Sequence, residues 1–130
     1  MGNPTEKQLI GKLGEDIAER FLVKHGHVII ERNFSVKGGE IDIISRKKGI
    51  LYFTEVKSVS RENISRETSD DHRPEDNIHP GKLKRMNLAI SLFLSFNKME
   101  DLDWEILGVA VSIDKTTKQA KVKLLDDFAW

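Results

Sequence analysis

The chain has 130 residues, of which 38% are hydrophobic, and this is enough apolar material for one compact domain with its own core. It contains no cysteine, which excludes disulfide frameworks and thiolate metal sites. Its 21 basic and 21 acidic residues give a formal net charge of zero, which argues against a protein that coats polyanions nonspecifically.

The first predicted element is an amphipathic helix from about Thr5 to Lys24. Apolar residues recur there at every fourth position, which places them on one helical face: Leu9, Leu13, Ile17 and Phe21. His25 and Gly26 end the helix. This N-terminal segment lacks the apolar block of a signal peptide, and no run of about 18 uncharged apolar residues follows. We therefore expect a cytoplasmic protein without a membrane partner.

Three short apolar segments rich in β-branched residues come next, and they predict three strands in an antiparallel meander. They run from Val28 to Phe34, from Glu40 to Ser45 and from Ile50 to Lys57, with glycine-containing turns between them. Residues 58–79 have few aliphatic side chains among many polar ones, so we expect a mobile loop at about 58–80.

The C-terminal half predicts one more helix and two more strands. The helix opens at Pro80 and Gly81 and extends to about Phe96, with a broad apolar stripe that should be well buried. A strand from Trp104 to Ile113 is apolar on both faces, and alternation from Ala120 to Leu124 predicts a half-exposed edge strand. The expected fold is a single α/β domain over residues 1–130, with a mixed five-stranded sheet flanked by helices in the order α-β-β-β-α-β-β.

The turn at Lys48 and Gly49 predicts how the second and third strands pair. A two-residue type I′ turn would pair Lys47 with Ile50. Counting back along both strands from this pair then places Asp42 opposite Glu55 and Glu40 opposite Lys57, on one face of the sheet.

Two opposed carboxylates, Asp42 and Glu55, would repel each other by about 3 kcal/mol. A bound divalent cation or a raised carboxyl pKa would relieve the repulsion, and oxygen ligands favour Mg²⁺ or Mn²⁺. The alternative is that both acids lie on a solvated sheet face, far enough apart to be harmless.

The same residues carry a family resemblance. Asp42, a spacer of twelve residues and then Glu55-Val56-Lys57 resemble the signature of the PD-(D/E)XK nuclease superfamily. Together with their surroundings, these residues closely resemble the YraN-like family of small bacterial proteins, which is itself similar to archaeal Holliday junction resolvases. The further positions that match are Gly11, Gly14, Glu15, Asp16, Ala18, Arg32, Asn33, Phe34, Gly39 and Lys82. The resemblance runs from about residue 8 to residue 113 and implies a restriction-endonuclease-like core.

Site residues follow from this resemblance. It implies that Asp42 and Glu55 bind the metal, with the carbonyl of Val56 as a further ligand. Lys57 would orient and polarise the attacking water, and Glu15 corresponds to the acid on the first helix of such nucleases. An ordinary solvated helix charge is the alternative for Glu15. The family usually has an arginine where this chain has Val59, which leaves substrate contact there open.

Basic residues suggest a path for phosphates. Lys82, with Lys84 and Arg85, lies in the first turn of the second predicted helix, where the helix dipole favours an anion. Arg32 and Lys37 would extend this nucleic-acid-binding path, although a solubilising basic turn is the alternative for the helix.

The sequence therefore leads to one main functional hypothesis and two alternatives. The first is a Mg²⁺- or Mn²⁺-dependent nuclease that hydrolyses DNA phosphodiester bonds, including those of branched, Holliday-junction-like DNA. Two cuts in a junction would require a homodimer. The alternatives are a non-catalytic protein with the same fold that binds nucleic-acid structures, and a protein-interaction domain.

Overall fold

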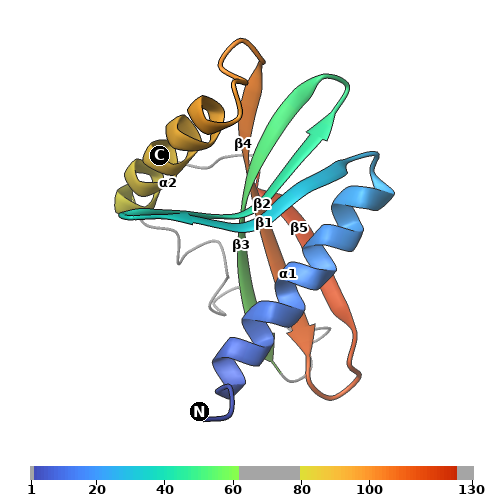
Figure 1. Cartoon of the computed structure of the whole chain (residues 1–130). Helices are drawn as coiled ribbons and strands as arrows, with labels where there is room; N and C mark the ends of the chain where they lie inside the picture. The colour runs from blue at the N-terminus through green and yellow to red at the C-terminus, as the bar shows by residue number, and fades with distance from the viewer. Residues whose placement is uncertain (1, 62–79, 126–130) are drawn as a thin grey trace.

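The computed structural model describes residues 2–61 and 80–125. Its elements are α1 (Glu6–Lys24), β1 (Val28–Val36), β2 (Gly39–Lys47), β3 (Ile50–Arg61), α2 (Pro80–Phe96), β4 (Trp104–Asp114) and β5 (Ala120–Leu125). The strands form one mixed sheet in the spatial order β1-β2-β3-β4-β5, in which only β3 and β4 are parallel. The predicted α/β class and element order are confirmed (Figure 1).

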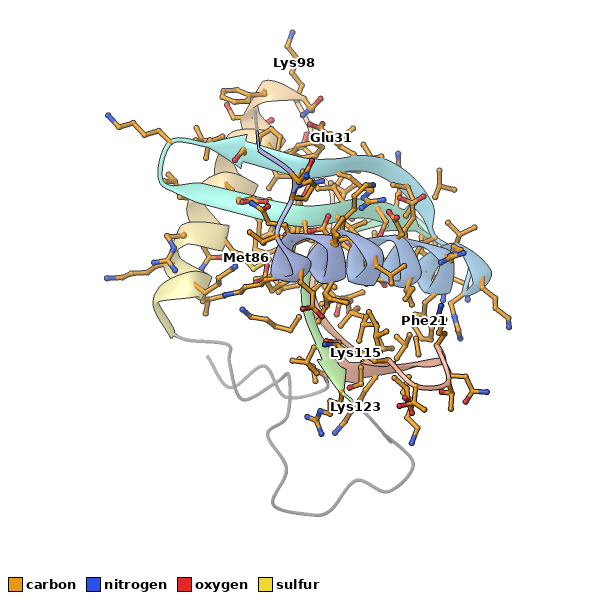
Figure 2. All side chains as sticks on the ribbon, turned by 90° about the horizontal axis from the view of Figure 1, so that it is seen from below. Phe21, Glu31, Met86, Lys98, Lys115 and Lys123 are labelled. Atoms are coloured by element: carbon orange, nitrogen blue, oxygen red, sulfur yellow. The ribbon has the colours of Figure 1, made fainter. Side chains whose placement is uncertain are left out.

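Helices cover the two faces of the sheet and create two apolar clusters. On one face Met86, Ile90 and Phe93 of α2 pack against the central strands, and Met86 lies between the helix and the sheet (Figure 2). On the other face Ala18 and Leu22 of α1 pack against β2 and β4. The stripe on α2 is narrower than predicted, because Leu88 is 45% exposed. None of the helices in the described residues is long and apolar enough to span a membrane.

Helix α1 begins as predicted but buries a different face. Thr5 caps the helix, and its side chain accepts a hydrogen bond from the backbone N–H of Gln8. The buried residues are Gly14, Ala18 and Leu22, whereas the predicted core residues Leu9 and Leu13 are exposed. The reason is close packing: a Cβ atom at Gly14 would overlap the side chain of Ser58 on β3. Small residues, and not the leucine spacing, therefore determine which face meets the sheet.

The β2–β3 hairpin has the predicted turn. Lys48 and Gly49 have φ angles of 51° and 80°, as a type I′ turn requires. The predicted register is confirmed from Lys47–Ile50 to Ile43–Thr54, but the pairing of the two strands ends there. The predicted cross-strand pairs of Asp42 with Glu55 and of Glu40 with Lys57 are therefore wrong. Beyond this point β2 continues to pair with β1, while β3 continues along β4.

Strand β3 is longer than the sequence predicts. It extends to Arg61, and residues 58–61, which were expected in the mobile loop, pair in parallel with β4 up to Asp114. The neighbouring strand supplies their backbone hydrogen bonds, which makes the polar composition of this segment compatible with a sheet. The rest of the predicted loop, residues 62–79, lies outside the described residues.

Candidate active site

A pocket of about 550 Å³ lies where β2 and β3 separate. Segments far apart in the sequence line it: the first half of α1, the middle of β2, the second half of β3, the first turn of α2 and the turn after β4. It brings together all the residues predicted to bind the metal or take part in catalysis, together with Lys82: Glu15, Asp42, Glu55, Val56 and Lys57.

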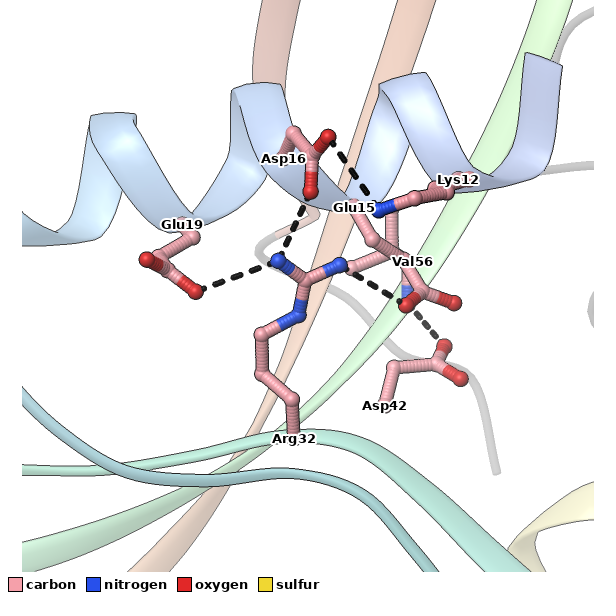
Figure 3. Close-up of polar contacts among 7 residues, drawn as sticks. All are labelled: Lys12, Glu15, Asp16, Glu19, Arg32, Asp42 and Val56. Carbon is pink, nitrogen blue, oxygen red and sulfur yellow. Dashed lines mark hydrogen bonds and ion pairs between the residues drawn. The ribbon is translucent and has the colours of Figure 1, made fainter. Parts of the chain in front are cut away.

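Asp42 lies at the end of the paired part of the hairpin. The residue is 8% exposed, and its Oδ2 accepts a hydrogen bond of 2.7 Å from the backbone N–H of Val56 (Figure 3). The carboxylate thus takes the place of a backbone carbonyl just beyond the last paired residues, Ile43 and Thr54. This bond fixes the carboxylate beside β3 although the two strands no longer pair.

Glu55 is buried beside Asp42 and is only half satisfied. The residue is 1% exposed, and its Oε2 lies 2.6 Å from Nζ of Lys82 on α2. Its Oε1 is buried without a hydrogen-bond partner. A buried carboxylate oxygen without a donor is costly, so this oxygen is a ready acceptor either for a ligand or for the proton that the neighbouring carboxyl of Asp42 can carry.

The electrostatics of the pocket disfavour two ionised acids. Burial, and secondly the charge of Glu55, raise the pKa of Asp42 to about 7, although the Val56 N–H and Lys82 oppose this shift. Burial, and secondly the charge of Asp42, also raise the pKa of Glu15. Because both acids are buried and the charge of Glu55 raises the pKa of Asp42, the alternative that both lie harmlessly on a solvated face is wrong.

These residues fit a divalent metal with a partly solvated coordination shell. Two buried carboxylates that repel each other, one with an unpartnered oxygen, are a suitable donor set for Mg²⁺ or Mn²⁺. In the parts of the chain that the structure describes, no three His, Cys, Asp or Glu side chains are grouped to hold a metal. Glu15 therefore lines the pocket without completing a three-carboxylate site, and water or substrate oxygens would have to supply the remaining ligands.

Arg32 binds acids of the protein itself. Its guanidinium lies 2.7 Å from Asp16, 3.2 Å from Glu15 and 3.2 Å from Glu19 (Figure 3). These ion pairs connect β1 to α1 and hold the carboxylate of Glu15 on the side of Asp42. The prediction that Arg32 lies on a nucleic-acid path is therefore corrected: its two terminal nitrogens already bind three carboxylates of α1.

Further lysines of the pocket were not predicted as site residues. Lys7 of α1 and Lys115 of the turn after β4 line it together with Lys57 and Lys82, and Lys115 lies 2.6 Å from Glu6. No local pattern in the sequence marks Lys7 or Lys115, because only the packing of α1 beside the end of β4 brings them together.

Arg85, a predicted nucleic-acid-binding residue, lies outside this pocket. It lines a neighbouring depression of about 290 Å³ together with Glu40 and Lys82. Lys82 is therefore common to both hollows.

Comparison with known proteins identifies relatives across the chain. A model of the family described as "Uncharacterised protein family UPF0102" matches residues 14–121. A UPF0102 protein of Flavobacterium psychrophilum is 34% identical over 95% of both chains. One of Nitratiruptor sp. is 40% identical over 79% of this chain and 82% of its own, and one of Herminiimonas arsenicoxydans is 38% identical over 73% and 71%.

Proposed function

This chain belongs to the uncharacterised protein family UPF0102, and we propose that its acidic pocket is the active site of a metal-dependent nuclease that hydrolyses DNA phosphodiester bonds. The observation that carries the proposal is the buried pair of Asp42 and Glu55 beside Lys57. The order and spacing of these three residues resemble the PD-(D/E)XK signature, which supports the same activity.

Asp42 and Glu55 would hold the metal, with the Val56 carbonyl as a further ligand. When bound, Mg²⁺ or Mn²⁺ would lower the pKa of a water and stabilise negative charge on the phosphate. The ammonium of Lys57 lines the same pocket and would orient the attacking water and offset charge that develops on the phosphorus oxygens. The carboxylate of Glu15, which is held by Arg32, would restrict the position of the attacking water from the α1 side of the pocket.

Lysines at the pocket support a phosphodiester substrate although the net charge is zero. Lys7, Lys57, Lys82 and Lys115 line the pocket beside four acids, of which Glu55 pairs with Lys82 and Glu6 with Lys115. A bound divalent cation would leave this lining with an excess of positive charge, and only cations close to the phosphate path contribute to the affinity for a polyanion. Lys82 and Arg85, at the start of α2, would contact phosphates that flank the cleaved bond. A branched substrate that needs two cuts would require two such pockets, and hence a homodimer.

Cleavage assays test the proposal directly. Linear, flapped and four-way DNA are incubated with wild-type protein and with Asp42→Asn and Lys57→Met in Mg²⁺ or Mn²⁺. We expect metal-dependent cleavage by the wild type and a loss of about 100-fold or more in both variants. Lys121→Met, on the edge strand β5 and outside the pocket lining, is the matched control and should cleave normally. Equal turnover by Asp42→Asn and wild type would reject the proposal.

A second candidate is a non-catalytic protein that binds nucleic-acid structures with the same pocket. The lack of a third His, Cys, Asp or Glu ligand in the described segments favours it. It predicts salt-dependent binding without turnover, and Asp42→Asn should then bind DNA as well as wild type or better, because the variant removes a negative charge from the pocket. A binding titration at several salt concentrations, run beside the cleavage assay, separates the two candidates.

A further inference from the structure

Lys82 occupies the position of a counter-ion in the acidic pocket. It is the third residue of α2, and its Nζ lies 2.6 Å from Oε2 of Glu55. The Lys82 side chain is 33% exposed, whereas that of Glu55 is only 2% exposed. The ammonium therefore closes the pocket from the solvent side over a carboxylate that is otherwise buried.

Lys82 is the cation that pairs directly with Glu55, and its charge also acts on Asp42. Burial lowers the pKa of Lys82, but the hydrogen bond to Glu55 and the charges of Glu55, Asp42 and Glu40 outweigh this, so its pKa is raised. The same ammonium lowers the pKa of Asp42. At Glu55 the ammonium thus stands where a divalent cation bound to Asp42 and Glu55 would lie, and it supplies part of the positive charge that such a cation would bring.

The ammonium of Lys82 and a metal ion cannot both bind the carboxylate of Glu55 at full strength. Two cations on one carboxylate would repel each other in a buried pocket where the effective dielectric constant is low. Lysine can move away easily, because its charge lies at the end of a flexible four-carbon side chain. The depression lined by Lys82, Arg85 and Glu40 offers a second location that the same side chain already borders.

We propose that Lys82 is a built-in counter-ion of the metal-free site, that a divalent metal displaces it from Glu55, and that the released ammonium is then available for a substrate phosphate. The inference rests on the proposed function, because it assumes that Asp42 and Glu55 bind a metal. It also reconciles two roles of Lys82 that one ammonium cannot fulfil at the same time. Metal loading would accordingly precede tight binding of the substrate.

Metal affinity, measured without any substrate, tests the competition. Mg²⁺ binding is followed by isothermal titration calorimetry at about pH 8.5, where the raised pKa of Asp42 no longer limits ionisation. We expect Lys82→Met to bind Mg²⁺ about ten-fold more tightly than wild type, because the repulsion between two cations is removed. Lys121→Met is the matched control: it removes an exposed charge from β5, outside the pocket lining, and should leave the affinity nearly unchanged. Equal or weaker binding by Lys82→Met would overturn the proposal.

Two further measurements keep the result decisive. Lys82→Arg retains the charge and should bind Mg²⁺ no more tightly than wild type, so tighter binding would contradict the competition. If Lys82→Met folds only when Mg²⁺ is present, the metal has replaced the missing cation, as the proposal requires. If Lys82→Met fails to fold both with and without Mg²⁺, the Mg²⁺ affinity of Lys82→Arg alone tests the competition.

The two proposals can fail separately. Absence of Mg²⁺ binding by wild type would remove the metal site and with it the proposed nuclease. Binding that Asp42→Asn abolishes but that Lys82→Met does not strengthen would leave the metal site intact and refute only the role of Lys82.

Discussion

Replacement of Asp42 by asparagine should stabilise the metal-free protein, and the gain should grow with pH. Folding raises the pKa of this carboxyl from 3.8 to about 7, mainly through burial. Between these values the folded state holds a proton that the unfolded state has released, so the free energy of unfolding falls as the pH rises from about 4 to about 7. Asparagine has no proton to lose and removes this loss of stability.

The size of the gain follows from the pKa shift. A shift from 3.8 to about 7 corresponds to about 4 kcal/mol at 1.36 kcal/mol for each pKa unit. Because Asp42 and Glu55 interact strongly, we expect about 2 to 4 kcal/mol at pH 8 and close to zero near pH 4. The geometry favours the substitution, since the amide oxygen can still accept the Val56 N–H and the amide nitrogen can donate to the unpartnered Oε1 of Glu55.

Urea unfolding in EDTA at about pH 4.5, 6 and 8 measures the effect as the difference between variant and wild type. Asp101→Asn, at an exposed position of the turn before β4, controls for the change in net charge. A gain of the same size at every pH, or a loss of stability at pH 8, would refute the reasoning that burial of an ionised Asp42 destabilises the fold.

Three other substitutions test ion pairs, packing and a buried histidine of the fold. Arg32→Met should lower the free energy of unfolding by about 1 to 3 kcal/mol, because three carboxylates of α1 lose their shared cation; chemical denaturation showing no loss would contradict this. Gly14→Ala should lower the free energy of unfolding by about 1 to 3 kcal/mol, because the added Cβ overlaps Ser58. Ser58→Gly in the same chain should then restore part of the melting temperature. If it restores none, overlap with Ser58 is not the cause of the loss. Burial, and secondly Lys47, lower the pKa of His27, so the contribution of His27 to stability should fall as the pH drops through about 6.5, opposite in sign to the contribution of Asp42. His27→Gln should therefore gain stability relative to wild type between pH 7.5 and pH 5 in thermal melts, and an unchanged difference between the two proteins would argue against it.

Local pattern was sufficient for the elements and for the main hairpin. Residues 48 and 49 have the positive φ angles that a two-residue turn needs, and the turn then predicts the register correctly as far as Ile43 and Thr54. That register predicts that Asp42 and Glu55 lie near each other, and both residues are buried and line the same pocket. The resemblance to the YraN-like family is likewise confirmed by the match to UPF0102, while nuclease activity stays a prediction.

Several errors have a common cause, which is contact between segments distant in sequence. Leu9 and Leu13 satisfy a helical stripe but are exposed, because the glycine at position 14 permits closer packing on the neighbouring face. Residues 58–61 look like a loop by composition, but the parallel partner β4 makes them a strand. The sequence gives Arg32 no local partner, but in the folded chain three acids of α1 form ion pairs with it.

The sequence by itself determined the order of the elements, the tight turn at Lys48 and Gly49 and the identity of the acidic pair, since these depend on short-range periodicity and backbone conformation. Tertiary structure decided how the acids are compensated: β2 leaves β3 after Ile43, Asp42 binds the Val56 N–H, and Lys82 reaches Glu55 from α2. Burial and Coulomb energies depend on distances across the folded chain, so the protonation of the site follows from packing that no local pattern encodes.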